Sequence, residues 1–325
     1  MLKIHRDLCI FAVAKQNDMI TIGQPHSIPR PIVATIGMFD GVHLGHRSLI
    51  EQVKQVAQDR KMATAVVTFA CHPRQILRPD APLPLLNTQE ERMALLDSTG
   101  IDYAIVLNFD SQLAQLSAHD FIALLHTQYN VHTLCIGYDH RFGHNRSEGF
   151  QEYCAHGQEI GVEVVEAKPH IIEQGTISSS NIRKSLMACN IDIANAMLGY
   201  KYRISGTVIS GNQLGRTIGY PTANIQLDNP HKLLPGSGAY AVKAKLNNGN
   251  TYGGMMNIGF RPTIGGERLS AEVYLIDFSD NLYNQHITIE FVAFIRKEEH
   301  FKSLEELQRA LQADEQTARK LLISS

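Results

Sequence analysis

Two histidines follow the first strand-like segment of the chain and could handle phosphate chemistry. His43 and His46 stand three residues apart in GMFDGVHLGH (residues 37–46), which leads into a segment with helical spacing. At that spacing both side chains can point to one side of a helix start, where free N–H groups and the positive dipole end suit phosphate. Two imidazoles beside a polyphosphate would stabilise developing negative charge, as donors or as cations. The spacing alone leaves a metal site or a structural role open, although zinc would need further ligands.

A serine-rich segment, ISSSNIRKSL (residues 177–186), supplies a second candidate site for phosphate. Ser179 stands at the expected start of a helix, and Arg183 follows in its first turns. Serine side chains and free N–H groups can cap the helix or hold phosphate, and arginine can bind phosphate through two nitrogens. Taken alone, the serines are equally compatible with a structural cap.

The C-terminal half contains a glycine-rich string, GNQLGRTIGYPTAN (residues 211–224). Its backbone could wrap phosphate, although the spacing is not that of a Walker A loop. Thr222 and Asn224 would point the same way in an extended segment. Their oxygens are plausible Mg²⁺ ligands, completed by substrate phosphates and water. A turn followed by an edge strand is the structural alternative.

Alternating strands and helices are predicted for about the first 190 residues. Strands are expected at residues 31–37, 63–69, 102–109, 131–137 and 162–167, separated by helices that include residues 47–59 and 148–160. This alternation predicts an α/β domain with a parallel sheet and right-handed crossovers. Ligands of such sheets bind at the carboxyl ends of the strands, which is where the histidine pair stands.

The pattern changes near residue 190. A short helical linker is followed by closely spaced β segments with glycine-rich turns, and a helix beginning near Ser303 closes the chain. Strands without intervening helices predict a small antiparallel barrel. We therefore expect a first domain at residues 1–188, a linker helix at 189–200 and a barrel domain at 201–325.

Composition excludes several classes of protein. The 325 residues include 30 Lys+Arg and 32 Asp+Glu, for a net charge of -2, which argues against bulk nucleic-acid binding. No apolar stretch approaches the 18 residues of a membrane span. The five cysteines are widely spaced without a C-x-x-C pair, which predicts reduced thiols in a cytoplasmic protein. The short apolar run at residues 8–14 favours a strand over a signal peptide. Residues 1–30 contain no other informative pattern. The sequence does not determine the oligomeric state.

The histidine and serine segments carry a resemblance. FDGVHLGH and ISSSNIR resemble the nucleotidyltransferase superfamily, and the first string resembles the FAD synthetase half of the bacterial bifunctional riboflavin kinase/FAD synthetase family. The resemblance implies a Rossmann-like domain that converts ATP and FMN to FAD and pyrophosphate, with His43, His46, Ser179 and Arg183 as catalytic residues. It implies ATP or flavin contacts from Gly37, Phe39, Asp40, Gly41, Gly45, His72, Pro73, Asp139, Phe142 and Gly143.

This half also departs from the family pattern. TFACHP (residues 68–73) is similar to the family's T-F-x-P-H-P, but Ala70 and Cys71 replace what is usually an acidic residue followed by Pro. In residues 137–149, which resemble G-x-[DN]-F-x-F-G, His140 stands where Phe is usual.

The C-terminal strings GRTIGYPTAN, NIGFRPT and AEVYLIDF resemble the riboflavin kinase domain of the same family, in the same order. The resemblance implies a six-stranded antiparallel barrel that phosphorylates the 5′-hydroxyl of riboflavin. Thr222 and Asn224 would hold Mg²⁺ with ATP, and Glu272 would be the base, although Tyr274 stands where the family usually has His. Without the resemblance, Glu272 would be interpreted as a salt-bridging strand residue. The residues predicted to bind ATP or flavin in this half are Gly211, Gly215, Arg216, Thr217 and Gly219.

The sequence thus predicts one enzyme that makes FMN and then FAD, with riboflavin, FMN and ATP as small-molecule substrates. Two alternatives remain open at this point. In the first, only one of the two sites is active and the other domain merely binds flavin. In the second, the protein carries flavin without turnover.

Overall fold

The structure, a computed structural model, describes residues 19–23, 28–77, 80, 83–137, 140–144, 146–168, 171–172, 175–210, 215, 218–263 and 266–323. The strand predicted at residues 8–14 lies outside the described residues, as do Asp139, Gly211, Arg216 and Thr217. The chain divides into two compact units. The first contains Met1–Met38, Arg47–Ile76 and Gln89–Pro169, and the second contains Phe39–His46, Leu77–Thr88 and His170–Ser325.

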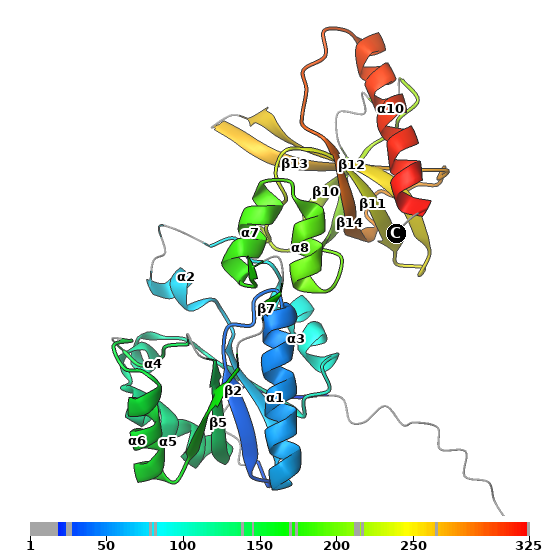
Figure 1. The fold of residues 1–325 in the computed structure, drawn as a ribbon. Helices are drawn as coiled ribbons and strands as arrows, with labels where there is room; N and C mark the ends of the chain where they lie inside the picture. Colours follow the sequence, from blue (N-terminus) through cyan, green and yellow to red (C-terminus); the bar gives the residue numbers. More distant parts are fainter. Residues whose placement is uncertain are drawn as a thin grey trace, which may run out of the picture. The chain divides into compact units, whose positions relative to one another are not determined.

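A six-stranded parallel sheet forms the centre of the first unit (Figure 1). Its order is β1-β4-β3-β2-β5-β6, and every pairing in it is parallel. The strands are β1 (Ile20–Ile22), β2 (Ile32–Ile36), β3 (Ala63–Phe69), β4 (Tyr103–Leu107), β5 (Val131–Gly137) and β6 (Glu163–Ala167). The chain leaves β2 toward β3 on one side and later returns to β5 on the other. The switch point of the sheet, where ligands of open α/β sheets bind, therefore lies between β2 and β5.

Helices cover both faces of this sheet, which explains why β2 is buried along its whole length. Val33 and Cys135 pack with Val53 and Ala57 of α1 (Leu44–Arg60) on one face. The opposite face packs against α5 (Ala118–Tyr129) and α6 (Phe150–Ile160). The remaining helices are α2 (Pro73–Leu77), α3 (Gln89–Asp97) and α4 (Ser111–Gln115).

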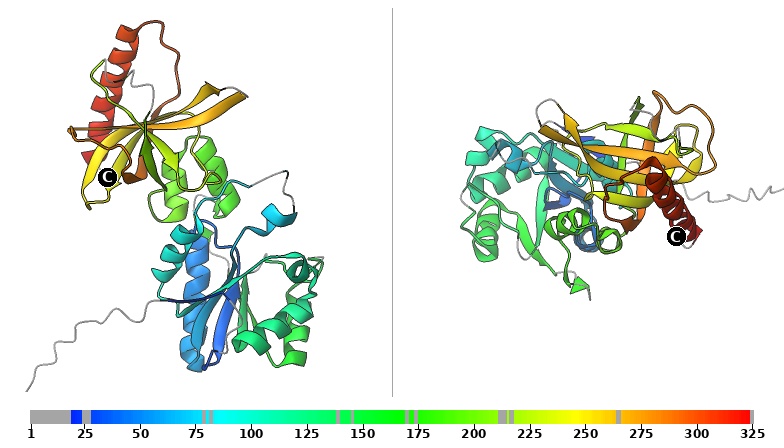
Figure 2. Two further views of the ribbon diagram at one scale, coloured as in Figure 1. Left: turned by 180° about the vertical axis from the view of Figure 1, so that it is seen from behind. Right: turned by 90° about the horizontal axis from the view of Figure 1, so that it is seen from above.

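The second unit is built around a closed antiparallel barrel of order β10-β13-β12-β11-β14-β9 (Figure 2). Its strands are β9 (Arg203–Ile209), β10 (Ala223–Leu227), β11 (Gly238–Leu246), β12 (Thr251–Thr263), β13 (Gly266–Leu275) and β14 (His286–Arg296). Helix α10 (Leu304–Ile323) packs on β11, β12 and β14. Arg296 at the end of β14 holds the buried Asp314 of α10 through Nε and Nη2, each 2.9 Å from a carboxylate oxygen.

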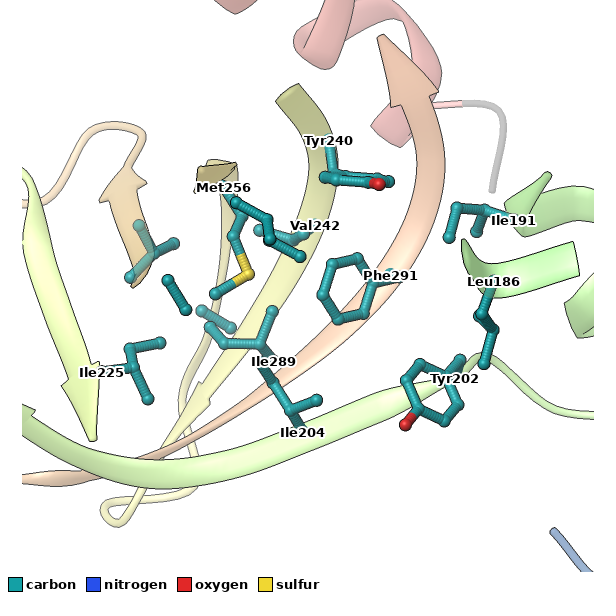
Figure 3. Close-up of a cluster of buried hydrophobic side chains, with 14 of the residues drawn as sticks. Leu186, Ile191, Tyr202, Ile204, Ile225, Tyr240, Val242, Met256, Ile289 and Phe291 are labelled. Atoms are coloured by element: carbon teal, nitrogen blue, oxygen red, sulfur yellow. The ribbon is translucent and has the colours of Figure 1, made fainter. Parts of the chain in front are cut away.

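Two helices extend the barrel core. Leu186 of α7 (Ser179–Met187) and Ile191 of α8 (Ile191–Leu198) join the same buried cluster as Tyr202 and Phe291 of the barrel (Figure 3). The Asn195 amide of α8 donates to the carbonyl of Phe291 at 3.0 Å and accepts from the Tyr202 N–H at 2.7 Å. A small hairpin of β7 (Ile171–Ile172) and β8 (Gly175–Thr176) precedes α7.

The predicted fold class, a parallel α/β sheet followed by an antiparallel barrel with a C-terminal helix, is confirmed. The five predicted sheet strands are present, and β1 is an additional edge strand. The helix expected in the linker is present as α8, although it is packed against the barrel strands rather than standing free. The domain boundaries at 188 and 201 stay a prediction. The compact units group residues 39–46, 77–88 and 170–188 with the barrel.

Candidate active sites

The loop after β2 bends through left-handed backbone before it enters α1. Phe39, Gly41 and Val42 have φ values of 53°, 90° and 34°. A Cβ added to Gly41 would lie 2.9 Å from Cδ1 of Leu86, so both conformation and space require glycine there. The Tyr200 hydroxyl donates to the Gly41 carbonyl at 2.8 Å and fixes the turn.

The buried carboxylate of Asp40 organises this loop. It is 2% exposed and accepts the backbone N–H groups of Leu86 at 3.1 Å and Asn87 at 3.0 Å. It also forms an ion pair with Nη2 of Arg183, whose Nε donates to the carbonyl of Pro84 at 2.7 Å. Two of the three Arg183 nitrogens are therefore engaged within the protein.

Ser179 joins the same group of residues from the first turn of α7. Its hydroxyl donates to the backbone carbonyl of Asp40 at 2.8 Å. The helix is capped by the preceding residue, Ser178, whose side chain accepts from the N–H of Asn181. Ser178 thus caps the helix, and Ser179 contacts the loop that contains Asp40.

The two histidines are stacked. The rings of His43 and His46 lie 3.6 Å apart between centroids at an angle of 15°, and Phe39 meets the His46 ring edge-on at 5.1 Å. The backbone N–H of His46 donates to Nδ1 of His43 at 3.3 Å. A neutral imidazole that accepts at Nδ1 carries its proton on Nε2, so His43 presents a hydrogen-bond donor there.

The charge state of His43 follows from its surroundings. Its side chain is 5% exposed. Burial lowers the pKa of His43 to about 4; an interaction of the ring with the backbone of residue 43 itself opposes this effect, and the positive charge of Arg183 adds to it. At neutral pH His43 is therefore an uncharged donor rather than a cation.

Phe142 and Gly143 stabilise the first unit. The Phe142 ring stacks on Tyr153 at 4.1 Å, and its N–H donates to the Tyr153 hydroxyl at 3.0 Å. Gly143 has a φ of 90°, and a Cβ there would lie 2.9 Å from the backbone N of Ala118. These contacts hold the Phe142 ring and restrict position 143 to glycine; the ATP or flavin contacts expected of both residues stay a prediction.

The segment after β3 contains further predicted residues. His72 accepts the N–H of Arg74 at Nδ1 at 3.0 Å, where Pro73 begins α2. Ala70 donates its N–H to the Leu107 carbonyl at 2.9 Å, and Cys71 is half-buried with a free thiol. Because Ala70 is attached to β4 through its backbone, the change in side chain leaves the path of the chain intact.

The barrel brings Thr222, Asn224 and Glu272 together. The Thr222 hydroxyl donates to Oε2 of Glu272 at 3.1 Å. The register of β10 and β13 pairs Asn224 with Glu272, and the register of β12 and β13 pairs Asn257 with Glu272. Directly opposed residues share a face of a sheet, so Asn257 belongs to this row. The sequence analysis did not single it out, although it begins the quoted string NIGFRPT.

The described residues of the glycine-rich string form local hydrogen bonds. Gly215 accepts the N–H groups of Ile218 and Tyr220 at its carbonyl, at 3.2 and 2.8 Å. Gly219 lies in the turn between them with a φ of 84°. These two bonds fix the turn that leads to Thr222.

Tyr274 has a structural explanation. It lies two residues after Glu272, and its ring meets that of Tyr220 edge-on at 5.1 Å. Burial, followed by the charge of Glu315 on α10, raises the pKa of Tyr274. The Tyr220 hydroxyl donates to Glu315 at 3.2 Å. The two tyrosines thus stabilise the packing of α10 beside the row of Glu272.

Within the described part of the chain, no group of three or more His, Cys, Asp or Glu side chains is placed to hold a metal ion. No helix among the described residues is long and apolar enough to cross a membrane.

The structure thus contains two groups of polar residues, one in the loop that follows β2 and one on the closed barrel, and both are candidate active sites. A FAD synthetase family model matches residues 26–181, and a riboflavin kinase family model matches residues 198–322. The chain belongs to the family of bifunctional riboflavin kinase/FMN adenylyltransferases.

Two curated relatives support this assignment over most of the chain, and one solved structure has a similar fold. The bifunctional riboflavin kinase/FMN adenylyltransferase of Haemophilus influenzae is 38% identical over 88% of this chain and 92% of its own length. That of Bacillus subtilis is 36% identical over 92% of this chain and 96% of its own length. A crystal structure described as a macrolide-efflux protein from Streptococcus pneumoniae has a TM-score of 0.84 and 30% identity, covering 93% of this chain and 99% of that one.

Proposed function

We propose that this chain carries out both reactions of its family, with the adenylyl transfer at the Asp40–His46 loop and the kinase reaction at the Glu272 row. The protein is a riboflavin kinase and FMN adenylyltransferase that uses ATP in both steps. The observation that carries the proposal is that both family matches are present in one chain, each with its polar residues brought together.

In the adenylyl transfer, an oxygen of the FMN phosphate attacks the α-phosphorus of ATP, and the bond to pyrophosphate breaks. The protein supplies no nucleophile; it positions the phosphates and neutralises the charge that develops on pyrophosphate. The Nε2–H of His43 and the ring of His46 are the proposed donors. Ser179 and Arg183 hold the Asp40 turn in place, and Nη1 of Arg183 is directed to phosphate in this proposal.

In the kinase reaction, the 5′-oxygen of riboflavin attacks the γ-phosphorus of ATP, ADP leaves, and the hydroxyl proton passes to Glu272. The Thr222 hydroxyl donates to Oε2 of Glu272, which fixes the orientation of the carboxylate. Because the transition state of phosphoryl transfer is loose, orientation of the attacking oxygen matters more than the strength of the base.

The residues around Glu272 fit a bound Mg²⁺. Thr222, Asn224 and Glu272 offer a hydroxyl, an amide and a carboxylate, the oxygen ligands that Mg²⁺ prefers. In this proposal Thr222 and Asn224 hold the ion, with ATP phosphates and water completing its shell. When bound, the ion would neutralise charge on the transferred phosphate.

The proposal is tested by chromatography after incubation of the protein with riboflavin, ATP and Mg²⁺. We expect FMN to appear first and FAD to follow. If FMN accumulates without FAD, only the kinase site is active and the alternative of a single live site holds. If the protein makes FAD from supplied FMN but not from riboflavin, only the adenylyl-transfer site is active, and the alternative of a single live site holds again.

Matched variants assign the two reactions to the two sites. His46→Ala should lower FAD formation from FMN by roughly 10²–10³-fold, the loss expected for one preorganised donor, and spare FMN formation. Glu272→Gln should lower FMN formation by roughly 10²–10⁴-fold, the range for a general base, and spare FAD formation from FMN. Each variant is the control for the other, and an equal loss of both reactions in either would contradict the assignment.

The proposal also locates both reactions in the cytoplasm. Cys71, Cys135, Cys154 and Cys189 are free thiols, as is usual where glutathione and thioredoxin keep cysteines reduced. Fractionation of the source cells, followed by assay of FAD formation, tests this location.

A further inference from the structure

A short segment of the second unit connects the adenylyl-transfer loop to the barrel. We call residues 84–87 the bridging segment. On one side it meets the Asp40 loop and Arg183, as described above. On the other side Leu85 donates its N–H to the carbonyl of His231 and accepts the N–H of Leu233, both at 2.8 Å, as in a β-bridge.

Lys232 contacts this segment from the barrel half of the sequence. It is 5% exposed, and its Nζ donates to the carbonyl of Leu86 at 2.6 Å. The Nζ also lies 4.9 Å from the centre of the Tyr202 ring, a cation–π contact. A buried ammonium is costly unless it is hydrogen-bonded, so these contacts hold the lysine in one place.

One peptide group lies between two opposite charges. The carbonyl of Leu86 and the N–H of Asn87 belong to the same peptide unit, which is trans because the described chain contains no cis bond. Its carbonyl accepts from Lys232, and its N–H donates to Oδ1 of Asp40 at 3.0 Å. In a trans peptide these two groups point in opposite directions. The ammonium and the carboxylate therefore polarise the same dipole in the same sense, which strengthens both hydrogen bonds.

We propose that Lys232 is a positioning residue for adenylyl transfer, acting from the kinase half of the chain through the Leu86–Asn87 peptide and Asp40. This inference rests on the proposed function, since it takes the Asp40–His46 loop as the adenylyl-transfer site. Asp40 fixes Arg183 and the turn that leads to His43. Without the ammonium, the Leu86 carbonyl loses its hydrogen bond to Lys232. The Leu86–Asn87 peptide then holds Asp40, and with it the loop of the two histidines, less rigidly.

The test uses the full-length protein and measures both reactions. Lys232→Met removes the charge and keeps most of the stem against Tyr202, whereas Lys232→Arg keeps a charged donor. Lys245→Met is the matched control, because Lys245 is an exposed lysine on barrel strand β11.

We expect Lys232→Met to lower kcat of FAD formation from FMN by roughly 10- to 100-fold, since a displacement of about 1 Å can cost 10²-fold. The KM for FMN should change by less than about threefold if positioning rather than substrate binding is lost. FMN formation should stay within about twofold of the wild type, Lys232→Arg should recover part of the loss, and Lys245→Met should behave as the wild type. FAD formation within about twofold of the wild type in Lys232→Met, or a parallel loss of both reactions, overturns the proposal.

A double-mutant cycle tests the route through Asp40. If Lys232 acts through Asp40, Lys232→Met should lower FAD formation by no more than about twofold in an Asp40→Asn background. Additive losses overturn the proposed route. A wild-type protein that forms no FAD from FMN would instead contradict the proposed function, so the two failures are distinguishable.

Discussion

The buried, neutral His43 makes the stability of the protein depend on pH in a defined direction. Its pKa is about 4 in the folded chain, against an ordinary value of 6.5, chiefly because burial disfavours the charged ring. Between these two values the unfolded chain binds a proton that the folded chain does not. The contribution of His43 is therefore fully present above pH 6.5 and is lost as the pH falls toward 4.

The size of the effect follows from the two pKa values. One pKa unit corresponds to about 1.4 kcal/mol, so the whole window is worth roughly 3 kcal/mol of unfolding free energy. Between pH 7.5 and pH 5.0 the expected loss is about 2 kcal/mol. His43→Gln keeps a polar side chain but removes this titration, so the variant should lack that part of the pH dependence.

Urea unfolding of the wild type and His43→Gln at both pH values measures the difference. The chain contains no tryptophan, so far-UV circular dichroism is the suitable signal. We expect the difference in unfolding free energy between the two proteins to change by about 2 kcal/mol between pH 7.5 and 5.0. A change below roughly 0.5 kcal/mol would refute the assignment of His43 as a buried neutral ring.

Three further predictions concern stability and use urea or thermal unfolding. Gly143→Ala should destabilise the protein by about 1–3 kcal/mol, because alanine would strain the backbone and contact Ala118. The control Gly100→Ala should cost less, because φ is also positive there but the space is open. Equal losses in the two variants would contradict the steric argument. Asp314→Asn should cost about 2–4 kcal/mol because it leaves Arg296 without its buried carboxylate. The control Asp277→Asn breaks an exposed pair with Arg319 and should cost about 0–1 kcal/mol; a similar cost for both would refute this reasoning. Tyr153→Phe should cost about 1–2 kcal/mol, since its hydroxyl bonds both backbone groups of Phe142, and an unchanged midpoint would show that these bonds contribute nothing net.

The sequence predicted those parts of the fold that short-range patterns determine. Strands β2 to β5 were expected at nearly the residues where they occur, because each is a short apolar segment bounded by polar or turn-forming residues. β1 has only three residues, two of them exposed, so it carried no hydrophobic pattern to recognise. A strand of that kind is defined by its partner β4 rather than by its own sequence.

Within the sites, the distance along the chain decided what could be predicted. His43 and His46 meet because they are neighbours at a helix start, and their spacing showed it. The ion pair of Asp40 and Arg183 joins residues 143 positions apart, and no local pattern indicates such a partner. The stacking of Phe142 on Tyr153 was equally hidden, because no short-range pattern indicates which ring an aromatic residue meets.

The contacts around Asp40 also set an order of events during synthesis. Leu86 and Lys232 are 146 residues apart, so a ribosome that adds about 5–20 residues per second makes the lysine roughly 7–30 s after the leucine. The strands up to β6 have all been made by then and can pair into their sheet. The loop that carries His43 and His46 is among the first segments to leave the ribosome, yet it is among the last to be completed. A chain that stops before residue 232 would contain every strand of the sheet and still lack a finished loop.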